Sequence, residues 1–291
     1  MKEHETHNKS IERLKLIAAM VIFGSLGLFR RQIPFPSSVL ALFRSFLASS
    51  FLGVYFLVSG KKLNLDRIKD NAKILLPSGL FLGINWILLF EAYNNTSVSL
   101  ATLAYYMAPI MVVFASPLVL GQAVPKRKLI LALVALAGMV LVSGVLTDSI
   151  YGPRGILLGL GAAFFYALVI IQNKKLKGLS SLETTIVQLF IAFITILPYV
   201  LLAEKIEWGQ LQGKVLILVL IIGLIHTGLS YLLYFASVNR LDLETSAIIS
   251  YLDPVEAILV SILILREAMS PIQIVGAIIV IVSMILSERN N

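Results

Sequence analysis

The sequence predicts an all-α integral membrane protein in which ten transmembrane helices form two inverted five-helix repeats around a central cavity. Three observations support this prediction: an apolar composition, ten apolar stretches of membrane-spanning length, and an internal repeat. Of the 291 residues, 58% are hydrophobic and only 14% are charged, and the mean hydropathy is +0.91. A soluble domain carries about 25% charged residues, so we expect most of this chain to lie in lipid.

A transmembrane helix needs about 20 mainly apolar residues to cross the hydrocarbon core of a bilayer. Ten stretches meet this requirement, and glycines or prolines that break helices lie between them. The expected spans are 14–30, 37–59, 72–93, 98–120, 129–146, 155–173, 183–203, 214–236, 245–265 and 270–287. Because the loops between the spans are short, the sequence leaves no room for an inserted soluble domain.

The placement of basic residues predicts the orientation, because cytoplasmic loops carry an excess of lysine and arginine. With the N-terminus inside, seventeen of the 24 lysines and arginines fall in the tails and loops on the cytoplasmic side, and six fall outside. We therefore expect both termini in the cytoplasm and the spans in a plasma or inner membrane. The net charge of +8 then reflects topology and contact with the lipid bilayer, and we expect no nucleic-acid partner.

The second half of the chain repeats the first at an offset of 145 residues, and the expected repeats are 11–147 and 153–287. Identical residues at this offset include the pairs Gly83 and Gly228, Phe90 and Phe235, Tyr106 and Tyr251, Pro109 and Pro254, and Ser116 and Ser261. Each repeat has five spans, an odd number, so the second must enter the membrane from the opposite side. Inverted repeats of this kind occur in transporters, with the substrate site at the midplane between the halves.

Each repeat also carries a copy of a short motif. These copies are the run Asn95–Ala101 with Tyr106-x-x-Pro109 and Leu120-Gly121-Gln122, and Tyr251-x-x-Pro254 with Arg266-Glu267. Together with Arg44 in the second span, they resemble the drug/metabolite transporter superfamily in its ten-helix EamA type, over nearly the whole chain. Gln122 stands where the family commonly has a glutamate. The resemblance implies a central cavity, alternating access and often proton-driven export of metabolites, and it leaves the substrate open.

Two carboxylates in the ninth span are candidates for proton coupling or substrate contact, since ionisable residues inside a span are costly. Asp253 and Glu256 lie three residues apart and therefore share a helix face. Two carboxylates that close in a low dielectric do not both ionise readily, which is what a proton-coupling site needs. Alternatively, Asp253 accepts hydrogen bonds at a kink next to Pro254, and Glu256 pairs with a basic residue.

Two further charged residues are candidates for substrate binding. Arg44 lies inside the second span and needs an anion there, which could be Glu91, Asp253, Glu256 or a substrate carboxylate. Glu91 lies near the outer end of the third span, where it could reach the mouth of a cavity or extend to the membrane interface.

Aromatic residues at repeat-related positions are expected to line the cavity, because midplane aromatic rings can bind an amine by cation–π contact. These are Trp86 and Tyr231, which coincide at the repeat offset, and Tyr106 and Tyr251. Packing against neighbouring helices is the alternative for each. Ser250 belongs to a stripe of small residues and is a further cavity candidate. The mid-span prolines, Pro109 and Pro254, remove backbone donors and are candidate hinges or plain elements of helix shape.

We expect a secondary active transporter, not an enzyme, that moves a small polar metabolite such as an amino acid or related amine by alternating access. Export with proton exchange or by facilitated diffusion is the leading hypothesis. The alternative is uptake of a quaternary amine such as choline through an aromatic cage, with Glu91 as counter-charge. A multi-pass membrane enzyme acting on lipid substrates is a more distant alternative. The chain has no cysteine, His226 stands alone in its span, and no metal or cofactor is expected; monomer and homodimer stay equally open.

The inverted repeat makes a topological prediction that thiol labelling can test, because the chain has no cysteine of its own. In intact cells, a membrane-impermeant thiol reagent should label the Lys214→Cys variant from outside. It should label the Lys128→Cys variant only after the membrane has been permeabilised. Labelling of both positions from the same side would contradict two halves of opposite orientation.

Overall fold

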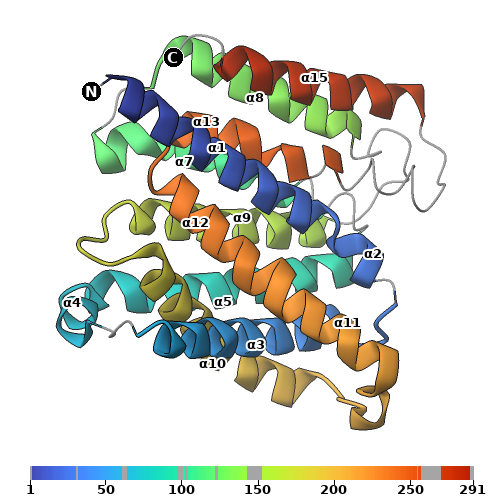
Figure 1. Cartoon of the computed structure of the whole chain (residues 1–291). Helices are drawn as coiled ribbons and strands as arrows, with labels where there is room; N and C mark the ends of the chain where they lie inside the picture. Colours follow the sequence, from blue (N-terminus) through green and yellow to red (C-terminus); the bar gives the residue numbers. More distant parts are fainter. Residues whose placement is uncertain are drawn as a thin grey trace.

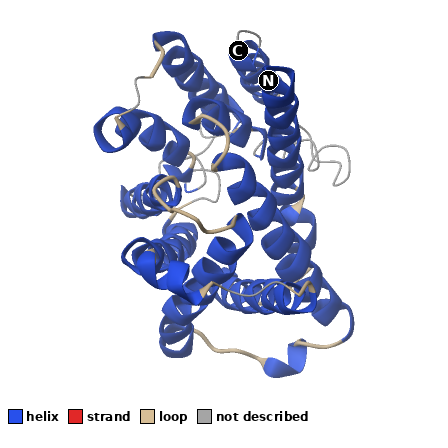
Figure 2. Cartoon of the chain, turned by 60° about the vertical axis from the view of Figure 1, so that its left-hand side comes forward, coloured by secondary structure: helices blue, strands red, loops and turns tan. Residues whose placement is uncertain are grey.

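The computed structural model describes residues 2–30, 32–60, 64–96, 101, 104–121, 124–142, 153–253, 255–256 and 270–288. Every regular element in these ranges is helical, and none of the described residues lies in a strand (Figure 2). Most of the long helices run side by side in one bundle (Figure 1). The all-helical fold predicted from composition and span length is confirmed.

The described helices follow the order of the expected spans. The first half contains α1 (Lys2–Gly24), α2 (Leu26–Arg30), α3 (Ser37–Val58), α4 (Leu65–Asp70), α5 (Ala72–Asn95), α7 (Met107–Leu120) and α8 (Lys126–Val142). The second half contains α9 (Pro153–Asn173), α10 (Ser181–Ala203), the 3-10 turn η1 (Trp208–Gln210), α11 (Gly213–Gly223), the π-helical η2 (Leu224–Leu229), α12 (Ser230–Val238), α13 (Leu243–Ser250) and α15 (Pro271–Glu288).

Five stretches of the described chain are long and apolar enough to cross a bilayer. They are Ser37–Val58, Ala72–Asn95, Pro153–Asn173, Ser181–Ala203 and Gly213–Val238. Three shorter apolar segments fall in other expected spans, namely Met107–Pro117, Leu129–Leu141 and Ile274–Ser283. Many large apolar side chains on these helices are exposed, as Leu202 is at 89%. Exposure on this scale is a liability in water and is expected where lipid covers the surface.

The pairs of helices that pack together follow the internal repeat, so that equivalent pairs are in contact. Helix α5 of the first half packs on α9 of the second, and the repeat-equivalent pair, α12 of the second half and α1 of the first, is also packed together. The pair α3 and α10 and the pair α8 and α15 each join two equivalent helices, and both pairs are in contact. Likewise α10 packs on α5, while α3 packs on α11 and η2. A contact pattern that is preserved when the halves are exchanged indicates a pseudo-two-fold axis between them.

The ends of the bundle agree with the alternation of the expected loops. In Figure 1 the N-terminal end of α1 and the short helix α4 lie at one end of the bundle, and α2 lies at the other. At the first of these ends, α4 is tied to the segment before α10. Asn71 donates to the carbonyl of Lys177 at 2.9 Å and accepts the Lys177 N–H at 3.0 Å, while Arg67 donates to the carbonyl of Gly178 at 2.6 Å.

Side-chain caps fix where two of the helices begin. Ser180 caps α10 by accepting the Glu183 N–H at 3.2 Å, and Glu183 accepts the Ser180 N–H at 2.9 Å, which forms a capping box. Asp242 caps α13 by accepting the Thr245 N–H at 3.0 Å. These bonds satisfy backbone donors that a helix start otherwise leaves unpaired.

The fourth and ninth spans are interrupted at equivalent positions. Tyr106 forms a turn before α7 begins, with φ −69° and ψ 1°, and Tyr251 follows the end of α13 with φ −73° and ψ −3°. The sequence predicted continuous helices with a mid-span proline, whereas Pro109 lies in the first turn of α7. A proline is tolerated there because its missing N–H would have no intrahelical partner. Pro254 lies outside the described residues.

The close contact between α5 and α10 depends on Gly83, whereas its repeat equivalent Gly228 is less tightly packed. A Cβ atom on Gly83 would lie 2.6 Å from the Cβ of Thr195 and 3.2 Å from the carbonyl oxygen of Ala192 on α10. At Gly228, the equivalent of Gly83, the added atom would lie 3.6 Å from the Cα of Ala48 on α3. Gly83 therefore lets α5 approach α10 closely, whereas a Cβ atom at Gly228 would make an ordinary van der Waals contact.

This packing predicts a large difference between two glycine-to-alanine variants. Gly83→Ala should destabilise the fold by about 1–3 kcal/mol, because the neighbouring backbone would have to move. Gly53→Ala is the matched control, since nothing lies within 4 Å of an added Cβ there, and it should be neutral or slightly stabilising. Thermal unfolding of the purified variants in detergent measures the difference. Equal melting temperatures for the two variants would contradict the packing described.

Candidate functional site

The two interrupted helices are joined by two tyrosines. The Tyr106 hydroxyl donates to Oδ2 of Asp253 at 2.8 Å, and the buried Tyr251 hydroxyl donates to the backbone carbonyl of Tyr106 at 3.2 Å. Their ring centroids are 6.4 Å apart. Because the two tyrosines are equivalent in the repeat, and equivalent residues can touch only close to a two-fold axis, this contact marks the axis.

A second pair of equivalent residues marks the same axis. Trp86 donates its indole N–H to the Tyr231 hydroxyl at 3.2 Å, across a separation of 145 residues. The two rings meet edge to face, with centroids 5.8 Å apart and an interplanar angle of 74°. We call Trp86, Tyr106, Tyr231 and Tyr251 the axial aromatic cluster.

Arg44 of α3 lies against this cluster. Its guanidinium carbon is 5.2 Å from the centre of the Trp86 ring, and its Nε donates to the Thr227 hydroxyl at 2.8 Å. The sequence left the anion for Arg44 open, and among the described residues no carboxylate forms an ion pair with it. The carboxylates expected to pair with it have other surroundings, described below. The guanidinium is therefore held by an aromatic face and a hydroxyl group.

The π-helix η2 positions the hydroxyl group that Arg44 contacts. The Thr227 hydroxyl donates to the Ile222 carbonyl five residues earlier at 2.9 Å, and Ser230 does the same to Ile225 at 2.9 Å. Short π-helical segments inside α-helices are frequent at functional sites. The sequence analysis missed Thr227, because a single threonine in an apolar span carries no signal until the widened turn directs it to Arg44.

Of the remaining candidate residues, Glu256 lies near the axis, whereas Glu91 and Ser250 bond to other residues. Glu256 follows Asp253 by one turn, and its Oε2 is buried with no hydrogen-bond partner among the described residues. Glu91 accepts a hydrogen bond from the hydroxyl of Tyr199 on α10. Ser250 donates to the Ser246 carbonyl of its own helix at 2.7 Å. The structure thus brings Arg44 and Asp253 to the axial aromatic cluster, while Glu91 and Ser250 bond elsewhere.

His226, which stands alone in its span, packs between helices of the first and second halves. It is buried in η2, its Nε2 is 3.1 Å from the Ser25 hydroxyl, and its ring meets Phe29 edge to face at 4.7 Å. These contacts join η2 to the junction between α1 and α2.

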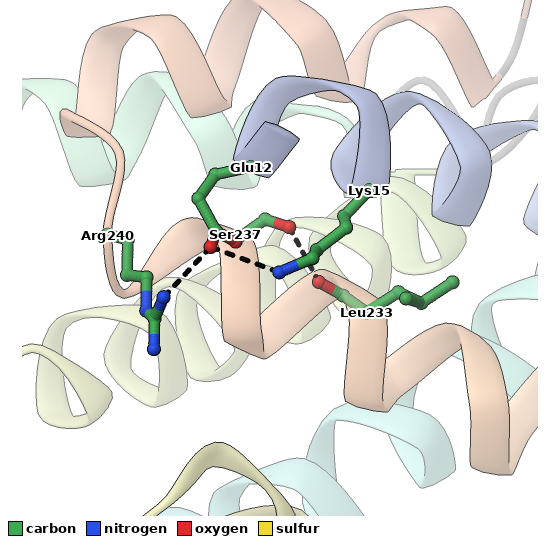
Figure 3. A network of polar contacts seen from close by, with 5 residues as sticks. All are labelled: Glu12, Lys15, Leu233, Ser237 and Arg240. Carbon is green, nitrogen blue, oxygen red and sulfur yellow. Dashed lines mark hydrogen bonds and ion pairs between the residues drawn. The ribbon is translucent and has the colours of Figure 1, made fainter. Parts of the chain in front are cut away.

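A charged network joins the two halves away from the axis (Figure 3). Glu12 of α1 is only 2% exposed, and its Oε1 accepts from Lys15 at 3.1 Å and from Arg240 at 3.0 Å. Arg240 follows α12, so the network fastens α1 of the first half to the end of α12 in the second. Sequence reasoning missed it, because Glu12 and Arg240 are far apart in the chain.

This network predicts that the two cations can replace each other. Lys15→Gln or Arg240→Gln alone should cost about 0.2–1 kcal/mol, since the other cation still compensates Glu12. The double variant removes both cations that pair with the buried Glu12 among the described residues, and it should cost about 3–5 kcal/mol. Unfolding of all four proteins in a denaturing detergent measures the non-additivity. A pair of exposed lysines, Lys69 and Lys205, is the control and should give additive effects; additivity at Lys15 and Arg240 would disprove the network.

Comparisons with known proteins agree with this architecture. The EamA-like transporter family model matches residues 11–144 and again residues 153–288. A Bacillus subtilis (strain 168) protein named Uncharacterized transporter YxxF is 31% identical over 289 residues, covering 96% of this chain and 90% of its own. Protein PecM of Dickeya dadantii (strain 3937) is 26% identical over 239 residues, covering 80% and 78%. One solved crystal structure shares the fold with a TM-score of 0.84 at 16% identity, covering 95% of this chain and 97% of that one.

These matches test the predictions made from the sequence. The duplicated family match confirms the resemblance that the motifs suggested, and it excludes the alternative of a membrane enzyme acting on lipids. Taken with the two helical halves around one axis, it shows that the chain belongs to the EamA-like transporter family of the drug/metabolite transporter superfamily and is a multi-pass membrane transporter.

Proposed function

We propose that this transporter exports a small polar metabolite, an amino acid or a related amine, in exchange for protons. The observation that carries the proposal is Arg44, a cation inside a membrane span with no carboxylate partner among the described residues. An uncompensated charge at this depth is costly. A substrate carboxylate would compensate it, because the planar guanidinium can bind both carboxylate oxygens at once.

Asp253 is the proposed site for the exchanged proton or for a substrate ammonium group. It lies at the junction of the interrupted helices, where Tyr106 donates to it, and Glu256 is one turn away. We propose that the halves 11–147 and 153–287 move against each other around a central cavity, with Pro109 and Pro254 near the hinges. If Asp253 carries no proton, the same site would support facilitated diffusion.

The contacts of Trp86 favour a substrate with a carboxylate over a quaternary amine such as choline. An aromatic cage binds an ammonium group on the faces of its rings. Here the protein's own Arg44 lies over the Trp86 ring, so an amine in this cage would meet a like charge. Glu91, the counter-charge suggested for such an amine, instead accepts the Tyr199 hydroxyl.

The proposed orientation places both termini in the cytoplasm. The support is the excess of basic residues in the tails and loops assigned to that side. Amino-acid export then moves the substrate away from the side that carries α4 and the start of α1 (Figure 1).

Flux measurements in proteoliposomes test the proposal. The wild-type protein should transport amino acids at a rate that depends on the pH gradient. Arg44→Lys keeps the charge but loses the bidentate geometry, so the KM should rise about tenfold or more. Asp253→Asn should transport at a rate that no longer responds to the pH gradient.

Arg154→Lys is the matched control, because Arg154 is exposed at the start of α9, and it should transport like the wild type. An unchanged KM in Arg44→Lys for every amino acid transported would rule out the carboxylate contact. A pH response that survives in Asp253→Asn would rule out this residue as the proton carrier.

A further inference from the structure

Tyr106 and Tyr251 are equivalent in the repeat, but their hydroxyl groups have different partners. The Tyr251 hydroxyl donates to the backbone carbonyl of Tyr106 at 3.2 Å. The Tyr106 hydroxyl donates to the carboxylate of Asp253 at 2.8 Å, and not to the carbonyl of Tyr251. The two halves therefore make non-equivalent contacts at the axis itself, although the backbone angles of the two tyrosines are nearly the same.

The difference has a consequence for an inverted repeat. A two-fold axis in the membrane plane exchanges the two sides of the membrane along with the two halves. If each half adopts the conformation of the other, the same packing therefore faces the opposite side. Each bond between the halves is then replaced by its equivalent, so the bond from Tyr251 to the Tyr106 carbonyl becomes a bond from Tyr106 to the Tyr251 carbonyl.

The sequence breaks the symmetry at Asp253. Its equivalent in the first half is Ala108, which has no polar side chain. The bond between a tyrosine hydroxyl and a carboxylate therefore has no counterpart in the exchanged state. A tyrosine hydroxyl has a single proton to donate, so Tyr106 cannot donate to Asp253 and to the Tyr251 carbonyl at the same time.

We propose that Tyr106 is a positioning residue that covers Asp253 in the state described here and uncovers it in the opposite-facing state, by moving its hydrogen bond to the Tyr251 carbonyl. The inference rests on the proposed role of Asp253 as the proton carrier. A proton exchanger has to restrict access to its carboxylate in one state, because access from both sides would let protons leak. Tyr106 supplies that restriction.

The other groups that face Asp253 do not replace Tyr106. Glu256 lies on the following turn, and α12, which carries Tyr231 and Tyr234, packs on α13, the helix that precedes Asp253. The Tyr231 hydroxyl accepts the indole N–H of Trp86. Glu256 is a second carboxyl group at the same place, so it has to be removed before the reactivity of Asp253 can be measured alone.

Carbodiimide labelling of the full-length protein tests the proposal. A hydrophobic carbodiimide forms an adduct with carboxyl groups in a membrane span, and mass spectrometry of the peptide counts the adduct on Asp253. All measurements use the Glu256→Gln background. Tyr251→Phe removes a bond of the covered state only, so labelling should be about two- to tenfold faster than in the background. Tyr106→Phe should be faster still, because Asp253 is then uncovered in both states.

Tyr105→Phe is the matched control, since Tyr105 neighbours Tyr106 in the chain and its hydroxyl is not bonded to Asp253. Its labelling rate should equal that of the background, and Asp253→Asn should abolish the adduct. The proposal is overturned if Tyr106→Phe labels no faster than Tyr105→Phe, or if Tyr251→Phe labels more slowly than the background. The comparison of labelling rates among the variants requires no transported substrate. A pH-dependent flux that persists in Asp253→Asn would thus defeat the proposed proton carrier and leave the switching of Tyr106 standing.

Discussion

The hydrogen bonds that Tyr106 makes to the second half, at the point where both interrupted helices meet, are the constraint on which the architecture depends. In a membrane interior, backbone and side-chain polar groups must find partners within the protein. A helix interrupted at mid-span leaves such groups unpaired unless another element supplies them. Here the second half supplies partners for polar groups at the first interruption, since the Tyr251 hydroxyl donates to the Tyr106 carbonyl and the Asp253 carboxylate accepts from the Tyr106 hydroxyl.

Residues that are repeated in both halves form the scaffold, whereas residues that differ between the halves form the candidate site. The equivalents of Arg44, Thr227 and Asp253 in the opposite halves are Leu189, Leu82 and Ala108. Each of these three polar residues thus has an apolar counterpart, whereas the tyrosines at the two interruptions occur in both copies. Symmetric packing permits two states of similar energy. An asymmetric set of charges allows those states to differ in what they bind.

Two further sets of contacts join the halves away from the axis. The network of Glu12 with Lys15 and Arg240 fastens one half to the other, and the bonds from Asn71 to Lys177 tie α4 to the segment before α10. Both lie toward the end of the bundle where α1 begins. Glu12 has two cationic partners, so its contact between the halves does not depend on a single side chain.

Composition, span length and the 145-residue offset were sufficient to predict the helical membrane fold and the duplication, because these are properties of local runs and linear spacing. The offset also identified Trp86 and Tyr231 as equivalent residues, but that they contact each other is seen only in the tertiary structure. The tertiary structure alone decided that Arg44 lies over Trp86 and bonds to Thr227, and not to a carboxylate. It also placed the interruption at Tyr106, three residues before Pro109. Such contacts join residues far apart in the chain, and helix rotation and packing choose among several partners that the sequence alone allows.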